Sequence, residues 1–157
     1  MKKTMMAVVT AAVVGACSSE PKYLSYEGLS MGLPAKVFAD SLLKRGMVVD
    51  TLNEETDRVV MLMPGETKKV TVIMNGEAIA SVQESYEATY NDSTRQLFKK
   101  YYDRLVEEIN PYPEMPKNAE DHKEARFQAD EGMVTLILEN TYTPSFGIVY
   151  ENKQSEE

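Results

Sequence analysis

The chain has 157 residues, with 17 basic and 25 acidic side chains, a net charge of −8, one histidine and one cysteine. A surface this acidic argues against nucleic acid and against anionic lipid headgroups as partners, because both repel it. The lone cysteine, Cys17, excludes an intramolecular disulfide. The length suits one domain with its own core and is too short for two domains of ordinary size.

The first residues have the pattern of a bacterial export signal. Lys2 and Lys3 precede the apolar run 5–16, which is too short to cross about 30 Å of hydrocarbon as a helix. Two cleavage patterns overlap at its end. Val14-Gly15-Ala16 suits ordinary signal peptidase, which would leave a free thiol on Cys17. Val14-Gly15-Ala16-Cys17 also resembles a lipobox, in which Cys17 is lipidated and becomes the first mature residue.

The lipobox interpretation is favoured because an unpaired thiol in an oxidising compartment is reactive, whereas a lipidated one is not. Two or three acyl chains hold a protein stably on a membrane. We therefore expect a signal peptide over 1–16, a lipidated Cys17 with a tether over 17–22, one domain over 23–152 and a flexible tail over 153–157. Ser18-Ser19-Glu20 carries a single acid, which favours a position in the outer membrane facing the periplasm.

The domain is predicted to begin with a short helix. Pro34 suits the first helical turn, and Gly46 suits the left-handed residue at which helices often end. Four apolar side chains between them fall on one predicted face, which we expect to lie against a sheet: Val37, Phe38, Leu42 and Leu43.

Strands are predicted next. The apolar run 58–63 is followed by a turn at Pro64-Gly65, and the runs 70–74 and 78–82 flank Asn75-Gly76, a strong hairpin signal. If Asn75 and Gly76 form a two-residue turn, Met74 faces Glu77 and Val72 faces Ile79.

A second helix is predicted before Pro111, with Ser93 as its cap, because Ser93 and Gln96 have capping-box spacing. Its apolar stripe is expected to be core rather than a ligand site: Leu97, Phe98, Tyr101, Leu105, Val106 and Ile109. A polar, proline-rich loop is predicted over 111–123. Strands are expected over 126–129 and 133–138, around Glu131-Gly132, and over 146–150.

The order helix, strands, helix, strands predicts an α+β fold. We expect an antiparallel sheet with two helices packed on one face, arranged as two related α-β halves. No sequence repeat is strong enough to prove a duplication.

One short motif suggests catalysis. Gly28-Leu29-Ser30-Met31-Gly32 matches G-x-S-x-G, and His122 follows later in the chain. The motif needs a buried strand before it and a large parallel sheet around it, and this chain is too short for that fold. His122 lies between Asp121 and Lys123 in a charged segment, where a histidine is usually solvated. A small serine hydrolase using Ser30 and His122 is therefore an unfavoured alternative.

Metal and cofactor sites are not predicted. Glu120, Asp121, His122 and Glu124 are ligand types, but the chain has no second histidine and no calcium-loop pattern. No glycine loop suited to phosphate occurs. We expect no metal, no cofactor and no catalysis.

The segment 26–46 resembles small, uncharacterised exported lipoproteins of Bacteroides-type bacteria, which begin with F-x-G-I-x-I-x-G, a helix bearing F-x-x-x-L, and a Gly. The positions that match are Gly28, Leu29, Gly32, Phe38, Leu42 and Gly46, with Tyr26 in place of the first Phe. The segment 148–152 resembles the closing strand of that group. Its layout is similar to BamE and to β-lactamase-inhibitor proteins, which bind other proteins. The resemblance therefore implies a binding role, by analogy of fold.

Three sites resemble the D-[S/T]-apolar acceptor that such bacteria O-glycosylate, namely Asp40-Ser41-Leu42, Asp50-Thr51-Leu52 and Asp92-Ser93-Thr94. Thr51 is the strongest candidate, because Ser41 falls within the first predicted helix and Ser93 at the start of the second.

These patterns together predict a lipid-anchored protein of the cell envelope with a non-catalytic binding or accessory role toward another protein. The membrane is a partner through Cys17, and nucleic acid is not. The predicted binding surface is the exposed sheet face or the 111–123 loop, since loops on a rigid sheet often carry recognition. A glycan-binding accessory protein using Tyr112 or Tyr142 is an alternative.

Overall fold

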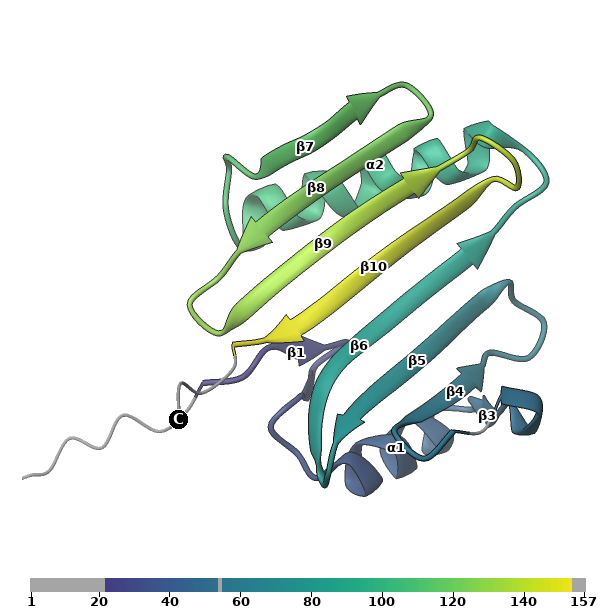
Figure 1. The fold of residues 1–157 in the computed structure, drawn as a ribbon, viewed down its shortest axis with the longest axis vertical. Coiled ribbons are helices and arrows are strands. Elements are labelled where there is room, and N and C mark those ends of the chain that lie inside the picture. Colours follow the sequence, from purple (N-terminus) through teal and green to yellow (C-terminus); the bar gives the residue numbers. More distant parts are fainter. Residues whose placement is uncertain (1–21, 54, 154–157) are drawn as a thin grey trace, which may run out of the picture.

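The computed structural model describes residues 22–53 and 55–153, so Cys17, the leader and residues 154–157 lie outside the described residues. Within them the chain forms an eight-stranded antiparallel sheet in the order β3-β4-β5-β6-β10-β9-β8-β7 (Figure 1). The elements are β1 (Ser25–Tyr26), β2 (Leu29–Ser30), α1 (Ala35–Lys44), β3 (Val48–Val49), the 3-10 turn η1 (Thr51–Asn53), β4 (Arg58–Leu62), β5 (Lys68–Asn75), β6 (Ala78–Glu87), α2 (Asn91–Glu108), β7 (Glu114–Ala119), β8 (His122–Gln128), β9 (Gly132–Glu139) and β10 (Ser145–Asn152).

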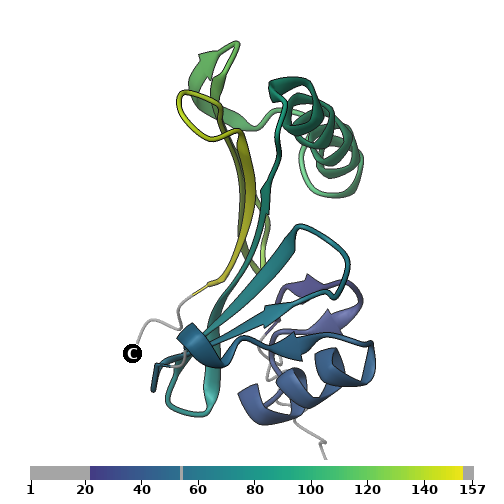
Figure 2. The same cartoon turned by 90° about the vertical axis from the view of Figure 1, so that its right-hand side faces the viewer.

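The predicted α+β fold, an antiparallel sheet with two helices, is confirmed, and its elements divide into two halves. Each half has a helix followed by four strands, α1 with β3 to β6 and α2 with β7 to β10, and the halves join where β6 pairs with β10. The short ribbon of β1 and β2 pairs only with itself. Figure 2 shows α1, α2 and this ribbon on the same side of the sheet, so among the described residues no α-helix lies on the opposite side.

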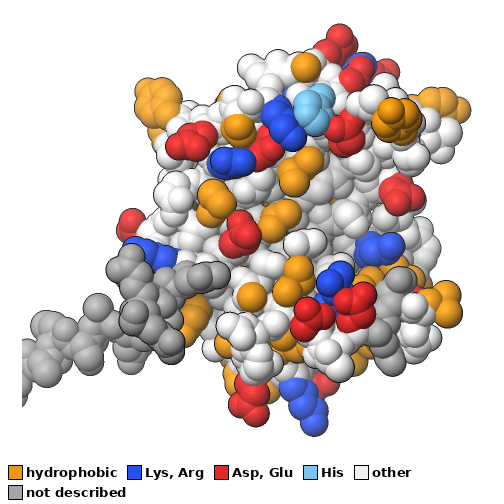
Figure 3. All heavy atoms as spheres, in the orientation of Figure 1, with side chains coloured by type: hydrophobic (Ala, Val, Ile, Leu, Met, Phe, Trp, Pro, Cys, Tyr) orange, Lys and Arg blue, Asp and Glu red, His pale blue; other side chains and the backbone are white. Residues whose placement is uncertain are grey.

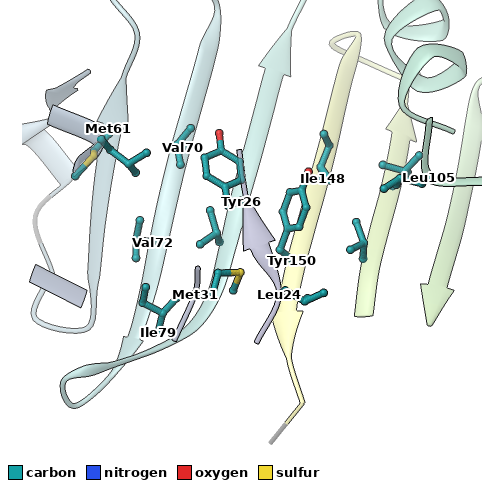
Figure 4. Packing of buried hydrophobic residues seen from close by; sticks show 14 of the residues in the cluster. Leu24, Tyr26, Met31, Met61, Val70, Val72, Ile79, Leu105, Ile148 and Tyr150 are labelled. Carbon is teal, nitrogen blue, oxygen red and sulfur yellow. The ribbon is translucent and has the colours of Figure 1, made fainter. Parts of the chain in front are cut away.

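The core lies between the sheet and this helical layer (Figure 4). Successive strand residues point to opposite faces, so each strand contributes every second side chain to the core. The largest fully buried side chains are Tyr26, Phe38, Phe127, Phe146, Met31, Leu42, Met61, Leu105, Leu136, Leu138, Ile148 and Val70.

Helix α1 buries a narrower stripe than predicted. Phe38 and Leu42 are fully buried, but Val37 is 48 % exposed and Leu43 is 39 % exposed, so their assignment to the core face was wrong. Residues adjacent in a helix point about 100° apart, and α1 presents one row of side chains to the sheet. Gly46 adopts φ +95° just after the helix, as predicted.

The hairpin between β5 and β6 is present, but its turn lies one residue later than predicted, so the predicted partner of Met74 was wrong by two residues. Asn75 pairs with Ala78 and Met74 pairs with Ile79, so the turn residues are Gly76 and Glu77. The carbonyl of Glu77 accepts a hydrogen bond of 2.9 Å from the Ala35 N–H, which couples the turn to the start of α1. A bulge next to Met74 then changes the register, so Val72 pairs with Val82 rather than Ile79.

Helix α2 begins earlier than predicted. Tyr90 occupies the cap position without a side-chain cap, and Ser93 lies inside the first turn, so the capping-box assignment was wrong. A tertiary contact stabilises this turn instead. The hydroxyl of the buried Thr94 lies 2.8 Å from the Asn91 carbonyl and 2.7 Å from Oδ1 of Asn140. The predicted stripe is confirmed as core, since its members are buried or packed against the core.

The predicted loop over 111–123 was wrong. It contains β7, an edge strand paired with β8, and a tight turn between Ala119 and His122. All but one of the residues of β7 are exposed, so the strand lacks the alternation of a half-buried one. Pro116 lies where the pairing register shifts, and proline is tolerated on edge strands and at bulges.

Candidate functional site

Ser30 and His122 do not form a catalytic pair. Ser30 lies on β2, where its Oγ accepts a 3.1 Å hydrogen bond from the Gly32 N–H. The segment that includes this ribbon is attached to the end of β10, where Leu24 N–H donates to Asn152 Oδ1 at 3.1 Å.

His122 lies at the other end of the sheet. Its Nδ1 is 2.5 Å from Oε2 of Glu139, and Glu139 pairs with Ser145 at the start of β10. At a rise of about 3.3 Å per residue, the length of β10 separates the two sites by about 20 Å. The serine hydroxyl therefore has no histidine base to activate it.

The predicted glycosylation acceptors differ in accessibility. Thr51 in η1 and Ser93 in the first turn of α2 are exposed. Ser41 is half-buried, and its hydroxyl donates a 2.8 Å hydrogen bond to the Val37 carbonyl within α1. Thr51 and Ser93 are thus the better placed of the three. Cys17 lies outside the described residues.

The tyrosines predicted for glycan binding are exposed but do not share a site. Tyr112 is 86 % exposed just before β7, and Tyr142 is 95 % exposed in the turn between β9 and β10. Those two positions are at opposite ends of the strands of the second half.

Among residues 22–53 and 55–153, no three or more His, Cys, Asp or Glu side chains are grouped so that they could hold a metal ion. Neither α-helix in this part of the chain has the length and apolar character needed to cross a membrane.

The bare face of the sheet is the first candidate surface (Figure 3). We define it by the strand residues whose side chains point away from the helices. Along each strand these residues alternate with the buried residues that face the helices. Its centre carries small or half-buried side chains: Thr71, Ile73, Gln83, Ser85, Met133, Thr135, Ile137, Gly147 and Val149. Around them lie four basic and five acidic residues: Arg58, Lys69, Lys117 and Arg126, with Glu87, Glu114, Glu124, Glu139 and Glu151.

On the opposite face, a charged residue is buried at the centre of the sheet. Glu84 on β6 is 2 % exposed. Its Oε2 accepts a 2.5 Å hydrogen bond from the Tyr26 hydroxyl and lies 3.4 Å from Nζ of Lys68. Its Oε1 accepts hydrogen bonds from the hydroxyls of Tyr86 and Tyr101, the latter at 3.1 Å. We call these five residues the Glu84 cluster.

The ionisation of the Glu84 cluster reflects this packing. Burial, followed by the charge of Glu84, raises the pKa of Tyr26 far above its usual range, and burial with the Glu84 hydrogen bond does the same to the pKa of Tyr86. Burial alone would lower the pKa of Lys68, but its hydrogen bond to Glu27 and the charge of Glu84 outweigh that effect and raise it. The tyrosines thus stay protonated donors to a carboxylate, paired with a lysine cation.

A cavity of about 420 Å³ lies beside the Glu84 cluster, between the β1–β2 ribbon and the C-terminal half of α2. We call it the central cavity. Its floor is formed by Glu84 on β6, Val134 on β9 and Tyr150 on β10. Its walls are formed by Leu24, Ser25, Glu27 and Gly28 on one side and by Tyr101, Arg104, Leu105, Glu108 and Ile109 on the other.

Neither the Glu84 cluster nor the central cavity is predicted from the sequence, although a signal for the cluster is present. In β6, Val82, Glu84 and Tyr86 alternate on the buried face, so a charge occupies a core position. Lys68 stands at the matching position of β5, where it pairs with Tyr86. Opposite charges at two inward positions of a hairpin are the pattern that would have indicated a buried ion pair.

The sequence matches no protein-family model, no curated protein and no solved structure. The resemblance to exported lipoproteins therefore stays a prediction.

Proposed function

We propose that the protein is a lipid-anchored component of the cell envelope that binds another protein, without catalysis, through the bare face of its sheet. The observation that carries the proposal is the one-sided arrangement of the fold. Both helices and the ribbon cover one face, while the other is left open and bowed inward (Figure 2).

The composition of the bare face favours a folded protein as occupant. Ile137 is 39 % exposed, and Ile73, Met133 and Val149 are half-buried, so apolar surface is available for burial. Gly147 and Ser85 pair at its centre and leave room for side chains of a partner. The charges around them are nearly balanced, four basic against five acidic, although the whole chain is acidic at −8. A mixed rim around a partly apolar centre is the usual anatomy of a protein interface, and its acidic residues disfavour a polyanion.

A lipid anchor would bring the domain to a partner in the envelope. The lipobox pattern at 14–17 supports attachment of the mature chain through Cys17, and we propose the outer membrane, facing the periplasm, as its location. Intact mass measurement of the protein extracted from its native membrane tests this part. We expect a mass that begins at Cys17 with diacylglycerol and acyl additions. A chain cut at Ala16 with a free thiol would overturn the anchor.

The binding surface is tested by placing a large cation on the bare face. A Cβ built on Gly147 finds its nearest atom, the Glu84 carbonyl oxygen, at 3.6 Å, and the position lacks a positive φ. Gly147→Arg is therefore expected to fold while blocking the face. Val37→Arg, at a 48 % exposed position on α1, is the control. We expect a partner crosslinked to the wild type in intact cells to be lost with Gly147→Arg and kept with Val37→Arg. Equal recovery with both variants would contradict the proposal.

A further inference from the structure

The central cavity has a size and position suited to a small ligand. About 420 Å³ lies within the range of small-molecule sites. The cavity sits over the junction of the two halves, on the side of the sheet opposite the bare face. A ligand bound there would not occupy the surface proposed for a protein partner, so the inference is independent of the proposed function.

A buried hydroxyl in the cavity has hydrogen-bonding capacity to spare. Tyr150 is 7 % exposed, and its ring meets that of Tyr26 edge to face at 5.4 Å (Figure 4). Its hydroxyl accepts a 3.2 Å hydrogen bond from Nη2 of Arg104. Burial raises the pKa of Tyr150 to about 12, so its hydroxyl stays protonated. Among the described residues, no group accepts a hydrogen bond from this hydroxyl. The Tyr150 hydroxyl can therefore donate a hydrogen bond to an oxygen acceptor bound in the cavity.

Arg104 supplies further donors on the same wall. Its guanidinium lies 4.6 Å from the centroid of the Tyr101 ring, and its Nε lies 3.6 Å from Oε2 of Glu108, too far for a hydrogen bond. One of its N–H groups is used by Tyr150, and its side chain is 43 % exposed. The stacked ring fixes the guanidinium in place, so its free N–H groups are pre-organised for a ligand.

The charges around the cavity disfavour a strongly charged ligand. Glu27, Glu84 and Glu108 line it together with Arg104. An anion would face these three carboxylates at short range. Each carboxylate already has a basic partner, because Lys68 Nζ lies 2.6 Å from Glu27 Oε1 and 3.4 Å from Glu84 Oε2 and Arg104 Nε lies 3.6 Å from Glu108 Oε2, so none is left unpaired for a cation. A neutral ligand with several hydroxyl groups avoids both costs, because it accepts from the donors and donates to the carboxylates.

Apolar surface completes the site. Leu24, Leu105, Ile109 and Val134 line the cavity beside the rings of Tyr101 and Tyr150. A sugar ring presents C–H groups on its faces and hydroxyl groups at its edge, which matches apolar walls with donors and acceptors between them. We propose that the central cavity binds a neutral sugar, either a monosaccharide or one residue at the end of a glycan.

Saturation-transfer NMR on the purified domain with glucose, galactose, mannose and N-acetylglucosamine tests this. We expect saturation of the protein to reach at least one of the four. Tyr150→Phe keeps the ring and removes the donor, and should weaken the affinity about threefold to tenfold, the range for one hydrogen bond. Arg104→Met keeps most of the stem and should weaken it more. The matched control is Arg126→Met, because Arg126 is also 43 % exposed but lies on the bare face.

Three results would overturn the proposal. The first is no transfer to any of the four sugars on folded wild-type protein. The second is unchanged binding in both Tyr150→Phe and Arg104→Met, each checked for folding by circular dichroism. The third is preference for acetate or ethylammonium over every sugar, which would show that the cavity selects charge. If Tyr150→Phe does not fold, Arg104→Met still tests the proposal, because the Arg104 side chain is only partly buried and its replacement should not prevent folding. Loss of partner crosslinking by Gly147→Arg with intact sugar binding would separate this proposal from the proposed function.

Discussion

Two neighbours in β6 show how differently the two faces of the sheet are used. Glu84 points to the helical layer, is 2 % exposed and is held by three tyrosine hydroxyls and a lysine. Gln83 points to the bare face and is half-buried, and its strand neighbours are Thr71 and Val149. Side chains on the covered face are constrained by the helices and the ribbon that pack against them. Side chains on the bare face lack these contacts and can be substituted with little effect on packing. Stability should therefore depend on the covered face and binding on the bare one.

The largest effect is expected from Glu84→Leu. The change leaves the hydroxyls of Tyr26, Tyr86 and Tyr101 without their acceptor and Lys68 with one carboxylate fewer. Removing one partner of a buried charge pair costs about 3–5 kcal/mol. We expect the free energy of unfolding in urea, followed by circular dichroism, to fall by about that amount. The matched variant Gln83→Leu, one residue away on the bare face, should change it by less than about 1 kcal/mol. Similar losses in both would show that the two faces are not distinct.

Alkaline pH should also weaken the covered face. The pKa of Tyr26 is raised in the folded protein, so the folded state holds a proton that the unfolded state loses above about pH 10. Stability from this group is complete below pH 10 and declines above it, by about 1.4 kcal/mol per pH unit. Tyr86 adds to the slope in the same direction.

Absorbance at 295 nm and circular dichroism, recorded together between pH 9 and 12.5, check this prediction. We expect one group of tyrosines to ionise without loss of structure and a second group to ionise only as the protein unfolds. Ionisation of every tyrosine while the circular dichroism stays native would contradict the account of the Glu84 cluster.

A smaller effect is expected from Tyr26→Phe. Tyr26 is fully buried, and the substitution removes one donor from the carboxylate of Glu84 while keeping the ring. A hydrogen bond to a charged group is worth about 1.5–3 kcal/mol. Urea unfolding should show a loss in that range. Tyr112→Phe, at an 86 % exposed position, should show none. An unchanged stability in Tyr26→Phe would mean that the other donors satisfy Glu84 without it.

The smallest effect is expected from Gly147→Ala on the bare face. Its Cβ would lie in ordinary contact, 3.6 Å from the Glu84 carbonyl oxygen, so stability should change by no more than about 0.5 kcal/mol. Gly132→Ala is the contrasting variant, because its Cβ would meet the Glu151 carbonyl oxygen at 2.0 Å. Thermal unfolding should leave the first variant close to wild type and lower the midpoint of the second by several degrees. Equal midpoints would contradict the difference in packing between Gly147 and Gly132.

The fold was largely predictable because apolar runs and turn residues are local signals. The dense run 58–63, the end of α1 at Gly46 and the stripe on α2 each gave the correct element. The details that failed depend on contacts between distant residues. The turn at Gly76-Glu77 is coupled to Ala35, and the first turn of α2 is held by Asn140. Neither contact can be predicted from the residues that flank it in the sequence.

The candidate sites were less predictable than the fold. The sequence predicts a loop where edge strand β7 lies, because exposure on both faces removes the alternation of buried and exposed residues by which strands are recognised. The order of Ser30 and His122 along the chain suggests a catalytic pair, but the two residues lie at opposite ends of the sheet. The order of residues in a sequence motif does not give the distance between them in the fold. The central cavity draws its lining from β1, β6, α2, β9 and β10, so only the folded chain brings it together.

Site-specific photocrosslinking in intact cells tests the central claim most directly. One photoreactive residue replaces Ile137, 39 % exposed on the bare face, and in a second strain it replaces Val37, 48 % exposed on α1. The account predicts a discrete protein adduct from position 137 and none from position 37. An adduct from position 37 with none from 137 would contradict it and assign partner binding to the helical side.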